Sequence, residues 1–340
     1  MADGSIRLYD HHQQEKLVDE SVTDDRRAIP TGFDGVDSLL RRGGLLPGNF
    51  VLLGGRTGTR KSTIMVNMMV SMAQANIPVG LVGLDEAPWT YVVKLMSGWS
   101  GKSQDEIEEQ WETDEGKEFR REYKAWAANQ VHIFGGRRPG IEHLDAAMEL
   151  ASMGSSNAPE VLFVDYLAQM SRSGPYAYGD NSRLPRLVED MQIWSTENGV
   201  VVVTLHQLSR NDEFGGTNNR NAGHLPVTLT QLKYGGEEQS DIVLGTYRPA
   251  MNPMALMPMS IAKEVLGDRF DEDLYWEAKA LAKKYENSTF LQLLKNRPGT
   301  HREERGIELV SPNESMWMLE KEASEPTRRE RDEQETANRA

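Results

Sequence analysis

The stretch from Gly55 to Ser62, GRTGTRKS, restricts what this chain can fold into more than any other part of the sequence. It follows an apolar run, Phe50–Leu53, and precedes residues 63–75, whose apolar side chains lie on all sides, as in a helix buried against a sheet. A loop between a buried strand and a helix binds anions, because the first N–H groups of the helix lack partners and its dipole favours negative charge. The stretch therefore predicts a strand, a phosphate-binding loop and a helix in succession.

The spacing of this loop matches the pattern G-x-x-x-x-G-K-[ST] with one departure, because Arg60 stands where the second glycine is expected. If that position is left-handed, an arginine there costs about 1–2 kcal/mol. Several charge-assisted bonds to a nucleoside triphosphate outweigh such a cost, so we expect the loop to bind ATP. The alternative is a glycine-rich turn with a chance Lys-Ser pair, and the flanking strand and helix argue against it.

In this interpretation Lys61 contacts the β- and γ-phosphates and Ser62 contacts Mg²⁺. The predicted nucleotide-binding residues are Gly55, Arg56, Thr57, Gly58, Thr59, Arg60, Lys61, Ser62 and Thr63.

Strand-like and helix-like patterns alternate along the chain, which predicts an α/β fold with a mostly parallel sheet and helices on both faces. Apolar strands are expected within residues 50–53, 77–84, 131–136, 160–167, 200–207, 242–249, 289–300 and 305–320. Helices are expected at Gly35–Arg42, 62–75, 103–129, 141–153, 184–198 and 273–287. The aromatic residues at helical spacing within 103–129 indicate core packing rather than a cofactor site. They are Trp111, Phe119, Tyr123 and Trp126.

Composition divides the chain into three parts. Residues 1–28 are polar and unpatterned, which predicts a flexible arm. Residues 29–320 carry the patterned segments, and a chain of 340 residues with 38% hydrophobic content can bury a sizeable core there. Residues 321–340 are charged and almost free of large apolar side chains, so we expect a disordered tail.

Several classes of protein and site are disfavoured by composition. The chain has no cysteine, which excludes disulfides and thiolate metal sites, and its seven histidines lack metal-ligand spacing. No run of about 18 apolar residues and no apolar signal segment occur, so we expect a cytoplasmic protein with no membrane partner. The net charge of −14 argues against a protein coated in basic surface, although many of the acids lie in residues 104–122 and 320–340. A nucleic-acid partner would therefore need local basic patches.

Polar side chains end three of the predicted strands. Asp165 follows the run VLFV and suits the role of holding Mg²⁺, although an ordinary strand ended by a helix-capping aspartate is the alternative. Gln207 ends a second strand, and the pair Asp85 and Glu86 ends a third. Ligands of parallel sheets bind at the carboxyl ends of the strands, so we expect these groups to surround the phosphate loop.

Several strings in this chain, taken together and in order, resemble the ATPase domain of DnaB-type replicative helicases, within the RecA/KaiC-like superfamily. They are IPTGFDGVDSLL, GGRTGTRKS, FVDYLAQM, LHQLSRNDE and LKNRPGT, and the resemblance runs from about Ile29 to Leu319. Departures from the family pattern are Arg60, GLDE in place of S-L-E-M, and His206 in place of a serine. Because no N-terminal helical or primase domain precedes residue 29, we expect a minimal form of such a protein.

The resemblance implies roles for matching residues. Asp85 aligns with the family's catalytic glutamate, but the paired acids of KaiC-like proteins leave Glu86 equally suited to activate water. Gln207 matches the glutamine that senses the γ-phosphate. Lys295 and Arg297 match a lysine and an arginine finger that act on ATP bound to the neighbouring subunit. Without the resemblance, these two residues would be no more than a basic turn.

Two long loops carry arginine and glycine, residues 171–186 and 209–224, and follow the strands that end in Asp165 and Gln207. Loops of this kind suit the backbone of single-stranded nucleic acid, although any one of their arginines has a plain surface position as the simpler interpretation. The candidate DNA-binding residues are Arg172, Arg183, Arg186, Arg210 and Arg220, with Tyr176 and Tyr178 beside them.

These features together predict an ATP-dependent DNA helicase motor that uses Mg²⁺ and moves on single-stranded DNA in replication. The resemblance implies a homo-oligomer, a hexameric ring, that hydrolyses ATP at its subunit interfaces and has a primase or loader as a further partner. The source would be bacterial or phage. One alternative is a RecA-like recombination or strand-loading ATPase that binds DNA without unwinding it, and another is a KaiC-like regulatory ATPase that acts on proteins.

Overall fold

The computed structural model describes residues 28–135, 139–154, 157–170, 183–208, 223–232, 236–297, 299, 303–311 and 315–321. The predicted arm and tail lie outside these ranges apart from residues 28 and 321, so the division into arm, domain and tail stays a prediction. None of the helices within the described ranges is long and apolar enough to cross a membrane.

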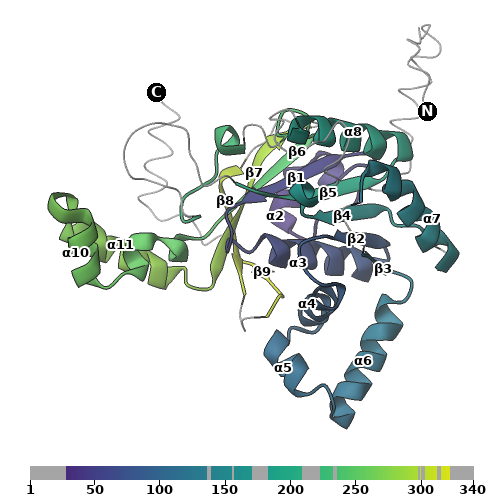
Figure 1. The fold of residues 1–340 in the computed structure, drawn as a ribbon, viewed down its shortest axis with the longest axis horizontal. Coiled ribbons are helices and arrows are strands. Elements are labelled where there is room, and N and C mark those ends of the chain that lie inside the picture. Colours follow the sequence, from purple (N-terminus) through teal and green to yellow (C-terminus); the bar gives the residue numbers. More distant parts are fainter. Residues whose placement is uncertain are drawn as a thin grey trace, which may run out of the picture.

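A single sheet runs through the described part of the chain, and six of its nine strands are parallel (Figure 1). Its order is β3-β2-β4-β5-β1-β6-β7-β8-β9, with β7, β8 and β9 antiparallel at one end. The strands are β1 (Phe50–Gly55), β2 (Val79–Gly83), β3 (Val131–Phe134), β4 (Val161–Asp165), β5 (Val201–Gln207), β6 (Ile242–Tyr247), β7 (Ser288–Asn296), β8 (Glu303–Val310) and β9 (Leu319–Glu320). The predicted mostly parallel sheet is confirmed.

Helices cover both faces of the sheet (Figure 1). The apolar residues of α3 pack on one face together with α4, and those of α7 and α8 pack on the other. Alternate residues of β1 supply the two cores, since Val51 and Leu53 join the α3 side and Phe50 joins the α8 side. The helices are α2 (Asp34–Asp37), α3 (Lys61–Gln74), α4 (Pro88–Ser100), α5 (Gln104–Glu109), α6 (Asp114–Ala127), α7 (Leu144–Gly154), α8 (Arg183–Asn198), α9 (Pro253–Leu256), α10 (Met259–Leu266) and α11 (Glu272–Lys284).

The expected helix at 103–129 is two helices, α5 and α6. Ser103 caps the first by accepting the N–H of Glu106 (3.1 Å), and Thr113 caps the second by accepting the N–H of Gly116 (3.0 Å). A second N-cap starts a new helix and therefore interrupts the first. Phe119, Tyr123 and Trp126 surround Trp99 of α4, whose ring centroid lies 5.6 Å from that of Phe119. Trp111 packs against the same core, so the core-packing interpretation is confirmed.

Other expected elements differ in extent. The helix expected at Gly35–Arg42 ends at Asp37, because Leu40 is extended and Arg42 has a left-handed φ of 61°. Helices α4, α9 and α10 were not predicted. The last two follow β6 in the chain and precede α11 and β7, and α10 and α11 project from the sheet at the left of Figure 1.

Candidate active site

The phosphate-loop candidate connects the carboxyl end of β1 to the start of α3. A Cβ atom at Gly55 would lie 2.2 Å from Oγ1 of Thr246 and 2.6 Å from Oγ1 of Thr59, so this position must be glycine. Those two hydroxyls are 2.7 Å apart and connect the loop to β6, while the Thr59 hydroxyl also lies 2.7 Å from the carbonyl of Arg56. The loop is therefore held in shape from inside and by a neighbouring strand.

Arg60 has the left-handed conformation that the missing glycine would adopt freely, with φ 63° and ψ 30°. Its Nη1 donates to the carbonyl of Asn287 (3.1 Å), just before β7. A guanidinium has only donors, so it cannot cap the N–H groups at the start of α3. The first helical bond runs from the N–H of Ile64 to the carbonyl of Arg60, so the N–H groups of Lys61, Ser62 and Thr63 precede the helical ladder, where an anion can meet them.

Replacing Arg60 with glycine is expected to tighten binding of a non-hydrolysable ATP analogue by up to about ten-fold. Backbone strain of about 1–2 kcal/mol at this position would otherwise oppose binding, and the side chain donates to the carbonyl of Asn287. Calorimetric titration of the two proteins measures the difference. Weaker binding by the glycine variant would mean that the guanidinium contacts a phosphate or the next subunit.

Lys61 lies inside the curve of the loop, where its Nζ donates to the carbonyls of Gly55 and Arg56, both at 2.8 Å. Burial lowers the pKa of Lys61 to about 8, against the opposite effect of the charges of Asp165 and Asp85. The ammonium therefore stays mostly charged at neutral pH and can meet the phosphates of a nucleotide. Ser62 follows it at the second position of α3, whereas the hydroxyl of Thr63 faces the sulfur of Met316 (3.6 Å).

Asp165 ends β4 beside the end of β2, as the sequence predicts. Its carbonyl accepts the N–H groups of Leu84 (2.7 Å) and Asp85 (3.2 Å), which brings the two strand ends together. Burial raises the pKa of Asp165 to about 6, and the negative charge of Asp85 adds to the rise. A buried carboxylate beside a lysine and another acid is a suitable ligand for a divalent cation, which would restore its charged form.

The two candidate bases differ in their surroundings. Glu86 forms an ion pair with Lys94 of α4, whose side chain is 12% exposed. Asp85 is exposed, and its charge acts on both Lys61 and Asp165. The charge of Asp85 thus acts on the lysine of the phosphate loop, whereas Glu86, whose charge also acts on Asp165, is paired with Lys94 of α4.

Gln207 reaches the loop directly, because its Nε2 donates to Oγ1 of Thr57 (2.5 Å). The neighbouring Leu208 donates its N–H to the carbonyl of Gly55 (3.3 Å). Gly223, the first residue after 209–222 in the chain, is also close to the loop, because a Cβ atom there would lie 2.8 Å from Cγ2 of Thr59. Both ends of that segment are thus fixed against the phosphate loop.

His206 is buried in β5, and its Nδ1 has no hydrogen-bond partner among the described residues. Burial, helped by the positive charge of Lys61, lowers the pKa of His206 to about 4. The imidazole is therefore neutral at neutral pH. The sequence shows only that a histidine replaces the family's serine here.

Acidification is expected to destabilise the wild-type protein more than a His206→Ser variant. Between the unfolded pKa of about 6.5 and the folded pKa of about 4, the unfolded chain binds more protons at this position, so the free energy of unfolding falls as pH falls. The extra loss from about pH 7 to pH 5 should be about 2 kcal/mol, measured by urea denaturation. The raised pKa of Asp165 makes the free energy of unfolding rise as pH falls. This effect is the same in both proteins, so it cancels when they are compared. Equal pH dependence in the two proteins would show that His206 stays solvated.

Two residues at the end of β6 belong to the site but were not predicted. Thr246 meets the hydroxyl of Thr59, and Arg248 donates to the carbonyls of Gly58 (3.3 Å) and Glu286 (3.0 Å). Both follow the rule that identified Asp165 and Gln207, since they lie at or just beyond the carboxyl end of a parallel strand.

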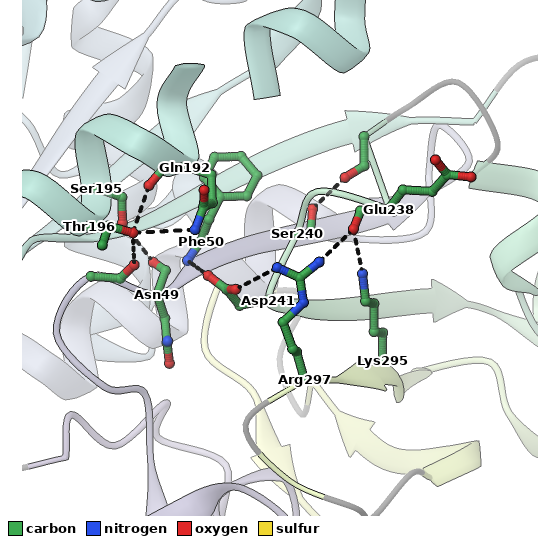
Figure 2. Close-up of polar contacts among 12 residues, drawn as sticks. Asn49, Phe50, Gln192, Ser195, Thr196, Glu238, Ser240, Asp241, Lys295 and Arg297 are labelled. Atoms are coloured by element: carbon green, nitrogen blue, oxygen red, sulfur yellow. Dashed lines mark hydrogen bonds and ion pairs between the residues drawn. The ribbon is translucent and has the colours of Figure 1, made fainter. Parts of the chain in front are cut away.

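Lys295 and Arg297 lie at the opposite edge of the sheet from the phosphate loop. Strand β7 is antiparallel to β6 and pairs Asn296 with Ile242, at the amino end of β6. Figure 2 shows both side chains there, beside Asp241 and the start of β1. Because β1 rises about 3.3 Å per residue, the length of the strand separates them from the loop of their own chain.

Most of the candidate DNA-binding residues lie outside the described residues, namely Arg172, Arg210 and Arg220 with Tyr176 and Tyr178. Arg183 is the first residue of α8, and Arg186 lies exposed one turn later. These assignments stay predictions.

The chain resembles known proteins in sequence and in fold. The family described as DnaB-like helicase C-terminal domain matches residues 28–287, more than half of the chain. A probable plasmid replicative DNA helicase of Chlamydia trachomatis is 23% identical over 260 residues, covering 74% of this chain and 53% of the relative. The replicative DNA helicase DnaB of Helicobacter pylori is 23% identical over 224 residues, covering 65% and 43%. The chain thus spans about half the length of these curated relatives.

Two solved structures show the same fold. One is a DnaB-like replicative helicase described with its interactions with primase, with a TM-score of 0.65 and 17% identity, covering 95% of this chain and 69% of that one. The other is described as an ATPase domain, with a TM-score of 0.63 and 18% identity, covering 91% and 95%. The predicted RecA-like fold is confirmed, and the extent of the family match shows that this chain belongs to the DnaB-like helicase C-terminal domain family.

Proposed function

We propose that this chain is an ATP-dependent DNA helicase motor that moves on single-stranded DNA and hydrolyses ATP between copies of itself. The observation that carries the proposal is the separation of the two halves of the site within one chain. The phosphate loop, Asp165 and Gln207 lie at the carboxyl edge of the sheet, and Lys295 and Arg297 lie at the amino edge. A neighbouring copy can bring the second half to the first, which favours a ring of subunits, and a hexamer is the expected size.

The residues of the loop fit ATP and Mg²⁺. The N–H groups at the start of α3 and the ammonium of Lys61 suit phosphate oxygens, while Ser62 and Asp165 would hold Mg²⁺. When bound, Mg²⁺ neutralises charge that develops on the phosphates. Gln207 contacts Thr57 and lies just before residues 209–222 in the chain, so it can relay the state of the loop to them.

Asp85 is the residue we assign to activating water. Its carboxylate is exposed beside Lys61 and Asp165, whereas that of Glu86 is paired with Lys94. Asp85 would orient a water molecule and accept its proton as the water attacks the terminal phosphate.

Replacing Asp85 with asparagine is expected to lower the ATPase turnover by about 100-fold, because loss of a general base typically has an effect of this size. The matched variant Glu86→Gln is expected to lower turnover by less than about ten-fold, because it removes only the ion pair with Lys94. Steady-state ATPase assays of both proteins make the comparison. The reverse order of effects would assign the role of base to Glu86.

The proposed function is tested by measuring ATPase rates with and without single-stranded DNA, followed by unwinding of a tailed duplex. A helicase motor should hydrolyse ATP faster with DNA and separate the duplex. An ATPase rate that rises with DNA, without unwinding, would favour a DNA-binding RecA-like ATPase. An ATPase rate that does not change with DNA would favour a KaiC-like ATPase. A primase or loader is a further partner to test, because the helicase in one similar structure is described with its interactions with primase.

A further inference from the structure

A tight turn, Gly236–Ser240, stands just before β6 at the amino edge of the sheet. Ser240 closes it by donating both its N–H (3.0 Å) and its hydroxyl (2.8 Å) to the carbonyl of Gly236. A Cβ atom at Gly236 would lie 2.3 Å from Cγ2 of Val188 in α8, and its φ is 93°. The turn is therefore packed closely on α8, and its remaining carbonyls are held in fixed directions.

These carbonyls hold the two cations at the end of β7 (Figure 2). Lys295 Nζ donates to the carbonyls of Glu237 (2.7 Å) and Glu238 (2.8 Å). Arg297 Nη2 donates to the same carbonyl of Glu238 (2.8 Å). The carbonyl of Glu238 thus binds both side chains and holds them next to each other.

Asp241 completes this arrangement from the first position after the turn. Its Oδ2 accepts the N–H of Phe50 (2.9 Å) at the start of β1, and its Oδ1 lies 3.4 Å from Nη1 of Arg297. Backbone hydrogen bonds join Asp241 to the same two residues. Its N–H donates to the carbonyl of Phe50 (3.0 Å), and its carbonyl accepts the N–H of Arg297 (2.8 Å). The Asp241 side chain is 11% exposed and that of Arg297 is 50% exposed, so the carboxylate is internal while the guanidinium can still meet another molecule.

These contacts restrict the direction in which the long side chain of Arg297 points. An arginine has many rotamers, and a group that stabilises a transition state loses most of its effect when it is misplaced by about 1 Å. Contacts from two fixed acceptors restrict the guanidinium to one direction. The same carboxylate binds the first residue of the strand that leads to Gly55, so a shift of β1 would reach Arg297.

We propose that Asp241 is a positioning residue for Arg297, which it aims at the neighbouring subunit and ties through β1 to the phosphate loop of its own chain. This role rests on the proposed hydrolysis of ATP between subunits. In this role Asp241 acts through Arg297 and not on ATP itself.

The first test is the variant Asp241→Asn, whose amide oxygen can still accept the N–H of Phe50 but whose charge is gone. The turnover number of the DNA-stimulated ATPase should fall about 10–100-fold, while KM for ATP stays within about two-fold. The matched control is Asp37→Asn, because Asp37 is equally buried at 8% exposure but its carboxylate accepts the N–H groups of Thr31 (2.9 Å) and Gly32 (3.3 Å) instead of contacting Arg297. That control should keep the wild-type turnover number, and a turnover number for Asp241→Asn within about two-fold of wild type would overturn the proposal.

A second variant changes an exposed residue, so its result does not depend on whether the protein folds with a substitution at a buried position. Arg297→Lys changes a half-exposed side chain and keeps the charge, but an ammonium cannot make the same forked contacts to Asp241 and Glu238. Its turnover should fall by about ten-fold or more, and adding Asp241→Asn to it should cause no further loss. An undiminished turnover in Arg297→Lys, or losses that multiply in the double variant, would show that Asp241 does not act by directing Arg297.

Mixed assemblies separate this inference from the proposed function. A Lys61→Ala subunit has an intact Arg297, so it should restore hydrolysis in a neighbouring Asp241→Asn subunit, as it should in an Arg297→Ala subunit. Exchange is checked by co-purifying differently tagged copies. Recovery with Arg297→Ala but not with Asp241→Asn would overturn only the role of Asp241. No recovery with either would overturn hydrolysis between subunits, and the positioning role with it.

Discussion

Replacement of Lys61 with alanine is expected to abolish ATP hydrolysis, leaving less than about a thousandth of the wild-type turnover. Lys61 is the lysine of the phosphate loop, and its ammonium lies against the loop carbonyls of Gly55 and Arg56. In a water-excluded site, loss of one such cation removes stabilisation of the charge that develops on the phosphates. ATPase assays with saturating Mg²⁺ and single-stranded DNA measure the effect.

The control for this prediction is Lys61→Met, which keeps the length of the buried stem and removes only the charge. Both variants should be inactive, and the methionine variant should unfold at a temperature close to that of the wild type. An alanine variant that stays above about a tenth of wild-type activity would show that this loop does not bind the hydrolysed nucleotide.

Arg297→Ala is expected to lower ATPase turnover by about 10³–10⁵-fold and to leave the affinity for a non-hydrolysable analogue unchanged. An arginine supplied by a neighbour stabilises the transition state of phosphoryl transfer rather than the bound substrate, which is the reason for this split. The structure keeps the guanidinium far from the loop of its own chain, so binding to that loop does not require it. Titration with the analogue and steady-state assays measure the two quantities separately.

If Arg297 acts on ATP bound to the neighbouring subunit, the Arg297→Ala variant should also be rescued by a second inactive variant. Each interface takes its loop and its finger from different subunits, so mixing inactive Arg297→Ala and Lys61→Ala proteins should restore part of the activity. Mixtures that stay inactive at every ratio, although the subunits exchange, would contradict the assignment. Weak analogue binding by Arg297→Ala would instead mean that the arginine holds the substrate in its ground state.

The sequence by itself was enough for the fold class and for choosing the residues of one half of the candidate site. The strand, the loop and the helix at Gly55–Ser62 are contiguous, so each requirement of the motif concerns residues close together in the chain. The ends of strands β4 and β5 were identified for a similar reason, because a buried strand is an apolar run and its last polar residue faces the ligand edge. The ends of individual elements were predicted less accurately, as the division of residues 103–129 into two helices shows.

Tertiary structure decided the questions that depend on contacts between distant segments. It separated Asp85 from Glu86, because only the packing of α4 brings Lys94 to Glu86. It directed Arg60 towards Asn287, which is 227 residues away in sequence, and it joined Asp241 to Phe50 across 191 residues. It also put Lys295 and Arg297 at the amino edge of the sheet, since β7 is antiparallel to β6. Local pattern fixes the type of an element, but strand order, direction and register arise from the whole core, and these decide which distant side chains meet.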